Sequence, residues 1–197
     1  MKEKILRKEV FRTMYYHIKV AGLERDLKLC PLNDTLSIAA FIMFGDVELT
    51  EKCAAALLAK APAFDVLLTA ESKGIPLAYE MARQAGTNRY LLARKEAKVY
   101  MSDVVKYEVN SITTKHPQTL YLDGDDAAYL RGKRVLIVDD VISTGESLLA
   151  LEHIVKEAGG IIAGKMTVLA EGDAQDRDDI VYLEKLPLFH ADGRILE

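Results

Sequence analysis

Short apolar runs of strand length alternate with longer segments of helical periodicity over most of the chain. The apolar runs predict strands at residues 26–32, 64–69, 89–93, 119–122, 134–138, 161–171 and 182–189. Helices are predicted at residues 50–60, 75–85 and 147–158. Strands that alternate with helices are typical of an α/β fold, in which helices cover both faces of a mainly parallel sheet.

A few residues set the predicted ends of these segments. Thr50 is a candidate N-cap for the first helix, because its hydroxyl can accept a hydrogen bond from the first turn. Gly86 is suited to end the second helix, and Pro187 interrupts the last apolar run. The segments 1–45 and 99–118 are less regular, and the pattern predicts little there beyond the strand at 26–32.

Length and charge limit the classes of function. A chain of 197 residues, half of them hydrophobic, predicts one globular domain. The net charge of −4 gives no general attraction to nucleic acid or membrane, so any anion site must be a local one. The longest apolar run, residues 38–44, is far shorter than the roughly 20 residues of a membrane span. Cys30 and Cys53 lack metal-ligand spacing and suit a reduced, cytoplasmic protein.

Residues 135–147 combine several groups that bind sugar phosphates. An apolar run ends in two adjacent carboxylates, Asp139 and Asp140, and a Ser/Thr/Gly loop at 143–147 leads into a helix. Backbone N–H groups of the loop and of the helix start attract an anion, and the helix dipole adds to this attraction. The carboxylates can accept hydrogen bonds from neighbouring hydroxyls or hold a hydrated Mg²⁺. The simpler interpretation is a buried strand followed by a capped helix.

The same segment resembles the phosphoribosyl pyrophosphate (PRPP) signature of type I phosphoribosyltransferases. The resemblance implies that Asp139 and Asp140 bind the ribose hydroxyls and Mg²⁺ and take part in catalysis. It places the 5′-phosphate on Ser143, Thr144, Gly145, Glu146 and Ser147. It also implies the type I phosphoribosyltransferase fold in a single domain of residues 1–197. The core of that domain would span about 46–170, with a small hood lobe from about 1–45 and 171–197.

A second strand–loop–helix junction lies at residues 69–76. Its exposed amides, the Ser72 hydroxyl and the Lys73 charge suit a diphosphate, although an ordinary helix start has the same features. The loop resembles the pyrophosphate loop of the family, which implies pyrophosphate contacts for Glu71, Ser72, Lys73 and Gly74. A basic cluster follows the next predicted strand, and its members are Arg89, Arg94, Lys95 and Lys98. The family has an Arg-Lys pair here.

The Arg-Lys pair of the family contacts pyrophosphate, and Arg94 and Lys95 match it best. The resemblance implies that Arg94, Lys95 and Lys98 bind pyrophosphate and that Arg94 takes part in catalysis. A solvated basic face is the alternative. Phe41 and Glu171 are candidates for stacking on or recognising a base, with core packing as the alternative for Phe41.

The resemblance implies a purine phosphoribosyltransferase that uses PRPP, Mg²⁺ and a nucleobase, with adenine favoured and xanthine next, and that forms a homodimer. Tyr107 and Glu108 resemble a pair in the loop of the adenine enzymes, whereas the residues after them are more similar to the xanthine enzymes. Two alternatives stay open. One is an orotate enzyme, suggested by residues 73–76, and the other is a PRPP-sensing regulator that does no chemistry. Neither a nucleic acid nor a membrane is expected as a partner.

Overall fold

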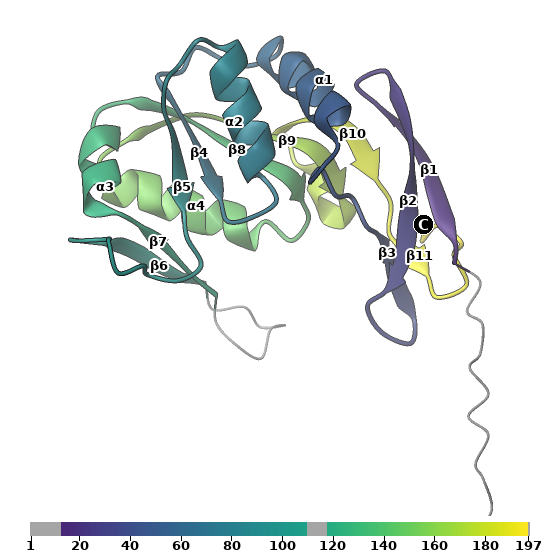
Figure 1. Cartoon of the computed structure of the whole chain (residues 1–197). Helices are drawn as coiled ribbons and strands as arrows, with labels where there is room; N and C mark the ends of the chain where they lie inside the picture. Colours follow the sequence, from purple (N-terminus) through teal and green to yellow (C-terminus); the bar gives the residue numbers. More distant parts are fainter. Residues whose placement is uncertain (1–12, 110–117, 197) are drawn as a thin grey trace, which may run out of the picture.

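The structure is a computed structural model that describes residues 13–109 and 118–196. The chain forms a larger lobe on a parallel sheet and a smaller lobe on an antiparallel sheet (Figure 1). The larger sheet has the strand order β10-β9-β8-β4-β5, and each pairing in it is parallel. Its strands are β4 (Val66–Ala70), β5 (Tyr90–Ala93), β8 (Arg134–Ile142), β9 (Ile161–Glu171) and β10 (Val181–Leu186). This arrangement confirms the predicted α/β fold.

Helices cover both faces of the larger sheet. Those on one face are α1 (Val47–Leu58) and α2 (Ile75–Gln84), and those on the other are α3 (Gly124–Leu130) and α4 (Glu146–Glu157). Successive side chains of β4 point to opposite faces, so Leu67 packs in the core with α1 and α2, whereas Leu68 packs with α4. Every residue of β4 is buried, as expected for a strand with covered faces.

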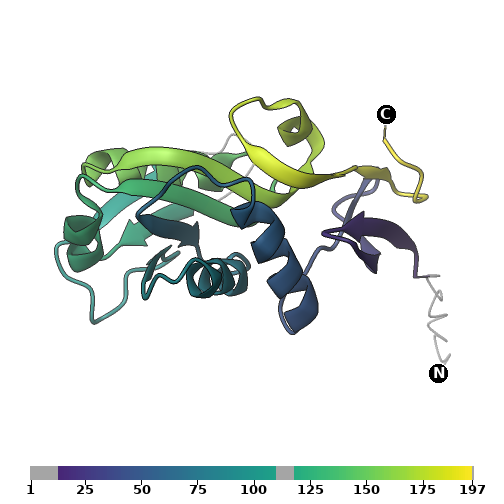
Figure 2. The same cartoon turned by 90° about the horizontal axis from the view of Figure 1, so that it is seen from above.

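The smaller lobe lies at one end of the larger sheet (Figure 2). Its antiparallel strands are β1 (Tyr15–Val20), β2 (Leu23–Pro31), β3 (Leu36–Ala39) and β11 (Phe189–His190). The last predicted strand, 182–189, is divided at Pro187 into β10 and β11. Because β10 pairs with β9, it belongs to the larger sheet, although residues 171–197 were expected in the hood. Among the C-terminal strands, it is β11 that joins the small lobe.

Helix α1 begins three residues before Thr50, which we had expected to be its N-cap. The cap is Asp46, whose carboxylate accepts a hydrogen bond of 3.0 Å from the Leu49 N–H. Thr50 is already inside the helix, and its hydroxyl donates to the Asp46 carbonyl at 2.8 Å. The prediction of Thr50 as the cap was therefore wrong, because Asp46 is an equally good capping residue that comes earlier in the chain.

Part of the segment 99–118 forms a hairpin rather than an irregular loop. Strands β6 (Val105–Val109) and β7 (Gln118–Leu122) pair antiparallel, and the turn between them lies outside the described residues. The Tyr107 ring stacks on the His153 ring of α4, with 4.1 Å between centroids. The base of the hairpin therefore packs against α4. No helix in the described ranges is long and apolar enough to cross a membrane.

Candidate active site

The carboxyl ends of two neighbouring strands, β4 and β8, form the candidate site. From β4 the chain passes through a loop at 71–74 into α2, and from β8 it passes through 143–145 into α4. The pairing of β4 with β8 ends at Leu68–Ile137, whereas β8 continues along β9 as far as Ile142. Asp139 and Asp140 therefore lie within β8, beyond its pairing with β4. The predicted strand ended too early, at Val138.

The acidic pair lies beneath the 71–74 loop. The Asp140 side chain is almost fully buried, and its Oδ2 accepts a hydrogen bond of 2.8 Å from Nζ of Lys73, which is about half exposed. Oδ1 of Asp139 accepts a bond of 2.9 Å from the Asp140 backbone N–H. The structure thus brings together the two residues predicted to bind ribose and a lysine predicted to bind pyrophosphate.

The charge of Asp139 is poorly compensated. Burial raises the pKa of Asp139 well above its usual range, and the neighbouring Asp140 charge raises it further, while the Lys73 ammonium opposes the shift. A cation bound beside such a carboxyl group favours its ionised form. The pair is therefore suited to a divalent cation or to sugar hydroxyls that donate hydrogen bonds.

Gly74 allows the 71–74 loop to approach β8 closely. A Cβ atom at this position would lie 2.3 Å from Oγ1 of Thr69 and 2.9 Å from Oδ1 of Asp139. A larger residue would therefore push the loop away from the carboxylates. The Thr69 hydroxyl is buried and finds no hydrogen-bond partner within the described parts of the chain. Sequence reasoning did not identify Thr69, because nothing in the local pattern separates it from a core threonine.

The second loop, residues 143–147, surrounds a hollow of about 130 Å³ that Asp139 and Leu148 also line. Gly145 precedes α4 in the left-handed conformation, with φ of 79°, and makes no side-chain cap. Because the residue at the cap position is a glycine, no side chain from this position occupies the N–H groups of the first turn of α4. Five predicted phosphate-binding residues lie together around this hollow, namely Ser143, Thr144, Gly145, Glu146 and Ser147.

Glu71 holds the two basic residues that follow β5. Its carboxylate lies 3.2 Å from Nη2 of Arg94 and accepts a bond of 3.0 Å from the Lys95 backbone N–H, while its own N–H donates to the Ala93 carbonyl at 2.8 Å. The Lys95 hydrogen bond and the Arg94 charge lower the pKa of Glu71. Because its polar groups are engaged in this way, Glu71 is placed to position Arg94 and Lys95.

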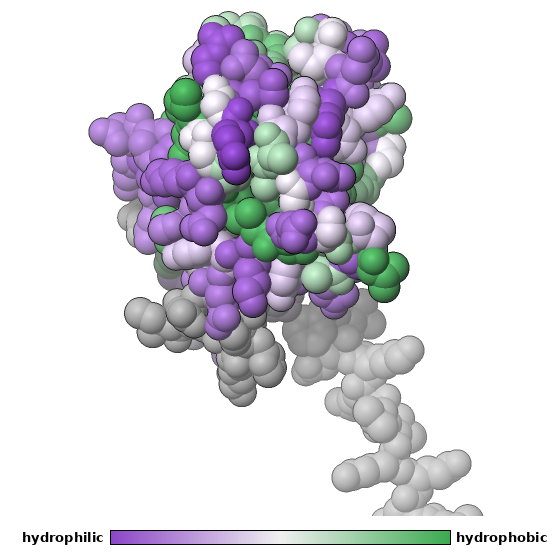
Figure 3. Space-filling view, turned by 90° about the vertical axis from the view of Figure 1, so that its left-hand side faces the viewer, coloured by the Kyte–Doolittle hydropathy of each residue, from purple (hydrophilic) through white to green (hydrophobic). Residues whose placement is uncertain are grey.

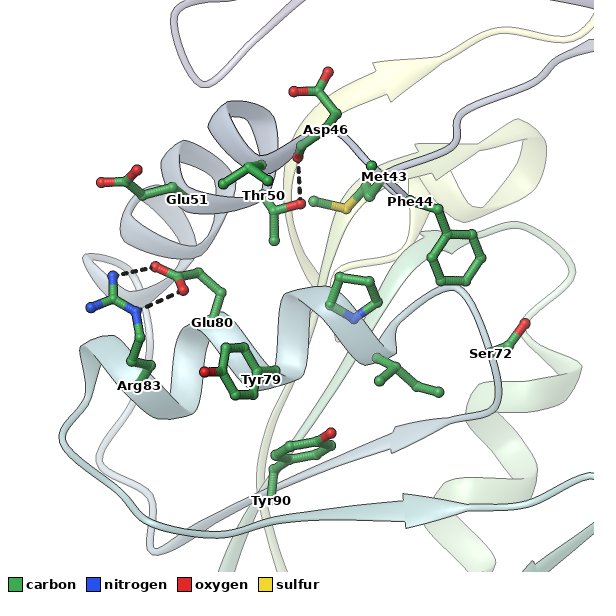
Figure 4. A pocket seen from close by; sticks show the side chains of 14 residues that line it. Met43, Phe44, Asp46, Thr50, Glu51, Ser72, Tyr79, Glu80, Arg83 and Tyr90 are labelled. Carbon is green, nitrogen blue, oxygen red and sulfur yellow. Dashed lines mark hydrogen bonds and ion pairs between the residues drawn. The ribbon is translucent and has the colours of Figure 1, made fainter.

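The other predicted pyrophosphate contacts are more dispersed. Lys95 has an exposed side chain, whereas Nζ of Lys98 lies 3.3 Å from a carboxylate oxygen of Glu96. Ser72 lines a separate hollow of about 670 Å³ along α1 and α2. In Figure 4, Ser72 and Phe44 lie at one end of this hollow, and the ion pair between Glu80 and Arg83 lies at the other. The hollow thus begins beside the 71–74 loop and leads away from it.

The two predicted base contacts have different environments. Phe41 is buried in the main hydrophobic core, where its ring packs against apolar side chains. Glu171 ends β9 in a buried position, where burial raises its pKa and the nearby Ser143 and Lys73 oppose the shift. Glu171 therefore lies with the acidic pair and the 143–147 loop.

Within the described ranges, no group of three or more His, Cys, Asp or Glu side chains is placed to hold a metal ion. A metal in this site would therefore depend on Asp139 and Asp140 together with oxygen atoms of water or substrate. Mg²⁺ binds in this way, through one or two carboxylates and substrate phosphates. The chemistry of the donor set consequently fits Mg²⁺ that arrives with a phosphorylated substrate.

Comparisons with known proteins point to one family. The chain is 33% identical over 111 residues to a hypoxanthine/guanine phosphoribosyltransferase of Methanotorris igneus, and 31% identical over 113 residues to one of Ferroglobus placidus. These matches cover 56% and 57% of this chain and 56% of each relative, so the chain spans about half the length of the curated relatives it matches.

Solved structures show the same fold. An adenine phosphoribosyltransferase of Thermoanaerobacter pseudethanolicus superposes with a TM-score of 0.67 at 23% identity, over 81% of this chain and 95% of that one. The adenine phosphoribosyltransferase of Saccharomyces cerevisiae gives 0.61 at 17% identity, over 86% and 92%. The family model described as phosphoribosyl transferase domain matches residues 49–192, which include both loops and the acidic pair. The chain therefore belongs to the phosphoribosyl transferase domain family.

Proposed function

We propose that the protein is a purine phosphoribosyltransferase of nucleotide salvage. It would transfer ribose 5-phosphate from PRPP to a purine base and release pyrophosphate. The observation that carries the proposal is the convergence of three groups at the ends of β4 and β8. These groups are the acidic pair, the 143–147 loop around its hollow, and the 71–74 loop with Lys73.

The proposed roles follow from the position of each group. The 5-phosphate of PRPP binds in the 143–147 loop, where hydroxyls and the N-terminus of α4 supply donors. Asp139 and Asp140 accept hydrogen bonds from the ribose hydroxyls. The diphosphate lies against the 71–74 loop, so that Lys73 exchanges its contact with Asp140 for one with the substrate. Arg94, Lys95 and Lys98 add positive charge on the same side.

Mg²⁺ is proposed to bind at Asp139 and Asp140 together with PRPP oxygens. When bound, the ion neutralises part of the charge of the diphosphate. The support from this chain is the raised pKa of Asp139, because a buried carboxyl beside a second carboxylate needs positive charge to ionise. Lys73 supplies part of that charge through its ion pair with Asp140, and its half-exposed side chain has room to turn toward a substrate.

The reaction breaks the bond between C1 of the ribose and the diphosphate oxygen, and the electron pair leaves with the diphosphate. The ribose gains positive charge in the transition state. A base nitrogen attacks C1 from the opposite face, and the proton of that nitrogen passes to solvent. Asp139 and Asp140 stabilise the developing charge, while Lys73 and Arg94 stabilise the leaving diphosphate. Once the substrate is bound and Lys73 has turned toward it, these charges need no further reorganisation during the reaction.

The base is a purine in this proposal. Adenine was our first expectation from the sequence and xanthine the next, whereas the relatives at 31–33% identity are named for hypoxanthine and guanine. We therefore place hypoxanthine and guanine first and keep adenine and xanthine as alternatives. Glu171, at the rim of the acidic pair, is the proposed polar contact to the base.

A panel of bases tests the proposal. The protein is incubated with PRPP and Mg²⁺ and with hypoxanthine, guanine, adenine, xanthine or orotate, and nucleotide is detected by mass. The proposal expects product from at least one purine and none from orotate. Product from orotate alone would contradict the purine assignment. No product from any base, with PRPP still raising the melting temperature, would favour the PRPP-sensing regulator.

We also propose that the protein acts in the cytoplasm as a homodimer. The free state of Cys30 and Cys53 is consistent with a reducing compartment. The support for a dimer is the 670 Å³ hollow along α1 and α2, whose lining includes the exposed side chains of Phe44, Val47 and Tyr79. Contiguous exposed apolar side chains of this kind are common at protein–protein contacts.

A further inference from the structure

Arg177 packs against the turn that forms the proposed phosphate site. A Cβ atom on Gly145 would lie 2.7 Å from Nη1 of Arg177. The guanidinium therefore lies directly against the backbone of Gly145, at the residue whose left-handed conformation directs the chain into α4. Arg177 lines a hollow of about 180 Å³. This hollow shares Thr144, Gly145 and Glu146 with the 130 Å³ hollow inside the 143–147 loop, here called the phosphate hollow, but it lacks Asp139. The arginine thus contacts the loop from a different side than the proposed substrate.

The guanidinium is held in one orientation. Its Nε and Nη2 donate to the two carboxylate oxygens of Asp179, each at 2.8 Å. Two parallel bonds of this kind fix a guanidinium plane as well as its distance. Nη1, the nitrogen that faces Gly145, donates to no residue that the structure describes. Asp179 therefore binds Nε and Nη2, and the remaining nitrogen, Nη1, faces Gly145.

Further ion pairs connect Arg177 to α4. Asp179 also pairs with Nζ of Lys165 in β9, and Lys165 donates to the Glu152 carboxylate of α4 at 3.1 Å. The chain of alternating charges runs from the loop after β9, through β9 itself, to the helix that begins at the phosphate loop. The group of side chains that approaches Gly145 is therefore also paired with α4.

The side chains that line the phosphate hollow supply no positive charge for a bound phosphate. The residues that line the hollow include Asp139 and Glu146 but no lysine or arginine. A phosphate there would rely on hydroxyls and backbone N–H groups, whose positions depend on the loop conformation. Arg177 is a cation in contact with that loop.

We propose that Arg177 is a positioning residue for the 5-phosphate site: it holds the Gly145 turn in the conformation that binds phosphate. This inference rests on the proposed function. It concerns how tightly PRPP binds and not the bond-breaking step, because Arg177 lies behind the loop. Its loss should therefore raise KM for PRPP while leaving kcat nearly unchanged.

The test compares three variants with the wild-type protein in the presence of Mg²⁺. Arg177→Gln removes the charge, and we expect KM for PRPP to rise about tenfold with kcat within about twofold, the size of effect that a small misplacement of binding groups produces. Arg177→Lys keeps the charge, and we expect it to recover part of that loss. The matched control is Arg134→Gln, because Arg134 makes a similar two-nitrogen contact to Asp65 at the far, amino end of β8.

Direct binding separates this inference from the proposed function. Mg²⁺-PRPP is titrated into each protein in a calorimeter. If the wild-type protein binds no PRPP, the proposed function fails whatever Arg177 does. If it binds PRPP and folded Arg177→Gln binds equally tightly, the inference on Arg177 fails alone. Asp179→Ala removes both oxygens that hold the guanidinium and leaves Arg177 in place. It serves if Arg177→Gln does not fold, and unchanged affinity in that variant would also overturn the inference.

Discussion

Asp140 illustrates how one buried carboxylate depends on its surroundings. It is almost fully buried, and its Oδ2 accepts a hydrogen bond from Lys73. Burying an ionised group without a partner is costly, so the lysine makes the buried carboxylate tolerable until substrate arrives. Because Lys73 is half exposed, it can turn toward a diphosphate without leaving a buried cation behind.

Asp140→Asn tests this role. We expect turnover to fall about a hundredfold, equivalent to roughly 3 kcal/mol in the barrier, because an amide cannot stabilise the developing positive charge as a carboxylate does. The fold should stay intact, since asparagine has the same shape and Lys73 can reach solvent. Steady-state kinetics with the circular dichroism spectrum as a control measure both effects. Near-normal turnover would show that the site is elsewhere.

The raised pKa of Asp139 predicts a proton linked to substrate binding. At pH values between its ordinary pKa of 3.8 and its higher pKa in the folded chain, Asp139 is protonated in the folded protein but ionised in the unfolded chain. Its contribution to stability is therefore largest at low pH and is lost as the pH rises through this interval. The Mg²⁺ ion that binds with PRPP would favour the ionised form of Asp139 and so expel the proton, and affinity should therefore increase with pH.

Calorimetry in buffers of different ionisation enthalpy measures the protons released on binding. We expect release in the wild-type protein near pH 6 and less release in Asp139→Asn, which has no carboxyl at this position. Equal release by both proteins would mean that another group titrates.

Individual site residues could be predicted where they follow one another closely in the sequence. Asp139, Asp140 and the 143–147 loop follow one another along a strand, a turn and a helix, so the sequence alone brings them together. The ion pair of Lys73 with Asp140 joins residues 67 positions apart and depends on which strands are neighbours. Phe41 was a candidate for base stacking with core packing as the alternative, and its burial agrees with core packing.

At the scale of elements, Asp46 connects the small lobe to the larger one. Its carboxylate caps α1, and it also accepts bonds of 2.7 and 3.2 Å from two nitrogens of Arg25 in β2. The Arg25 guanidinium lowers the pKa of Asp46. This residue thus fixes both the start of a helix and the position of a strand from the other sheet.

Two variants separate these contributions. Asp46→Ala removes the cap and the ion pair, and we expect a loss of at least the 0.5–2 kcal/mol that is typical of a helix cap. Asp46→Asn keeps a capping oxygen but removes the charge, so it should lose less. Chemical denaturation measures both. If the two variants were equally destabilised, the cap would contribute nothing beyond the ion pair.

The sequence predicted the buried parallel strands better than the peripheral elements. Strands β4, β8 and β9 have long apolar runs because both faces of the sheet are covered. Strand β1 alternates buried and exposed residues, which gives a weaker signal, and α3 has only seven residues. Strand β7 was predicted at residues 119–122, whereas β6 was missed because it has only five residues and charged residues interrupt its apolar ones.

At the scale of the whole molecule, the apolar surface is unevenly distributed. Three large apolar side chains are exposed beside one hollow, namely Phe44 (50%), Val47 (77%) and Tyr79 (57%). Apolar side chains that are scattered singly over a surface need no explanation, but a group of this kind does. By contrast, Figure 3 shows that the face on the left side of Figure 1 is largely hydrophilic, with small separate hydrophobic groups. The α1–α2 face is therefore the better candidate for contact with a second copy.

Tyr79→Lys should convert a dimer into a monomer, because it places a charge in the middle of that face. The matched control is Ile161→Lys, since Ile161 is also 57% exposed but lies at the start of β9 and does not line the hollow. Sedimentation velocity gives the mass of each protein. A monomeric wild-type protein, or a dimer that survives Tyr79→Lys, would exclude this face as the interface.

The central claim is that the ends of β4 and β8 form a PRPP site. The most direct measurement is a calorimetric titration of PRPP into the wild-type protein and into the double variant Asp139→Asn, Asp140→Asn, with and without Mg²⁺. We predict one site per chain in the wild-type protein, tighter binding with Mg²⁺, and a severe loss of affinity in the folded double variant. Absence of binding by the wild-type protein, or equal binding by the double variant, would contradict the account.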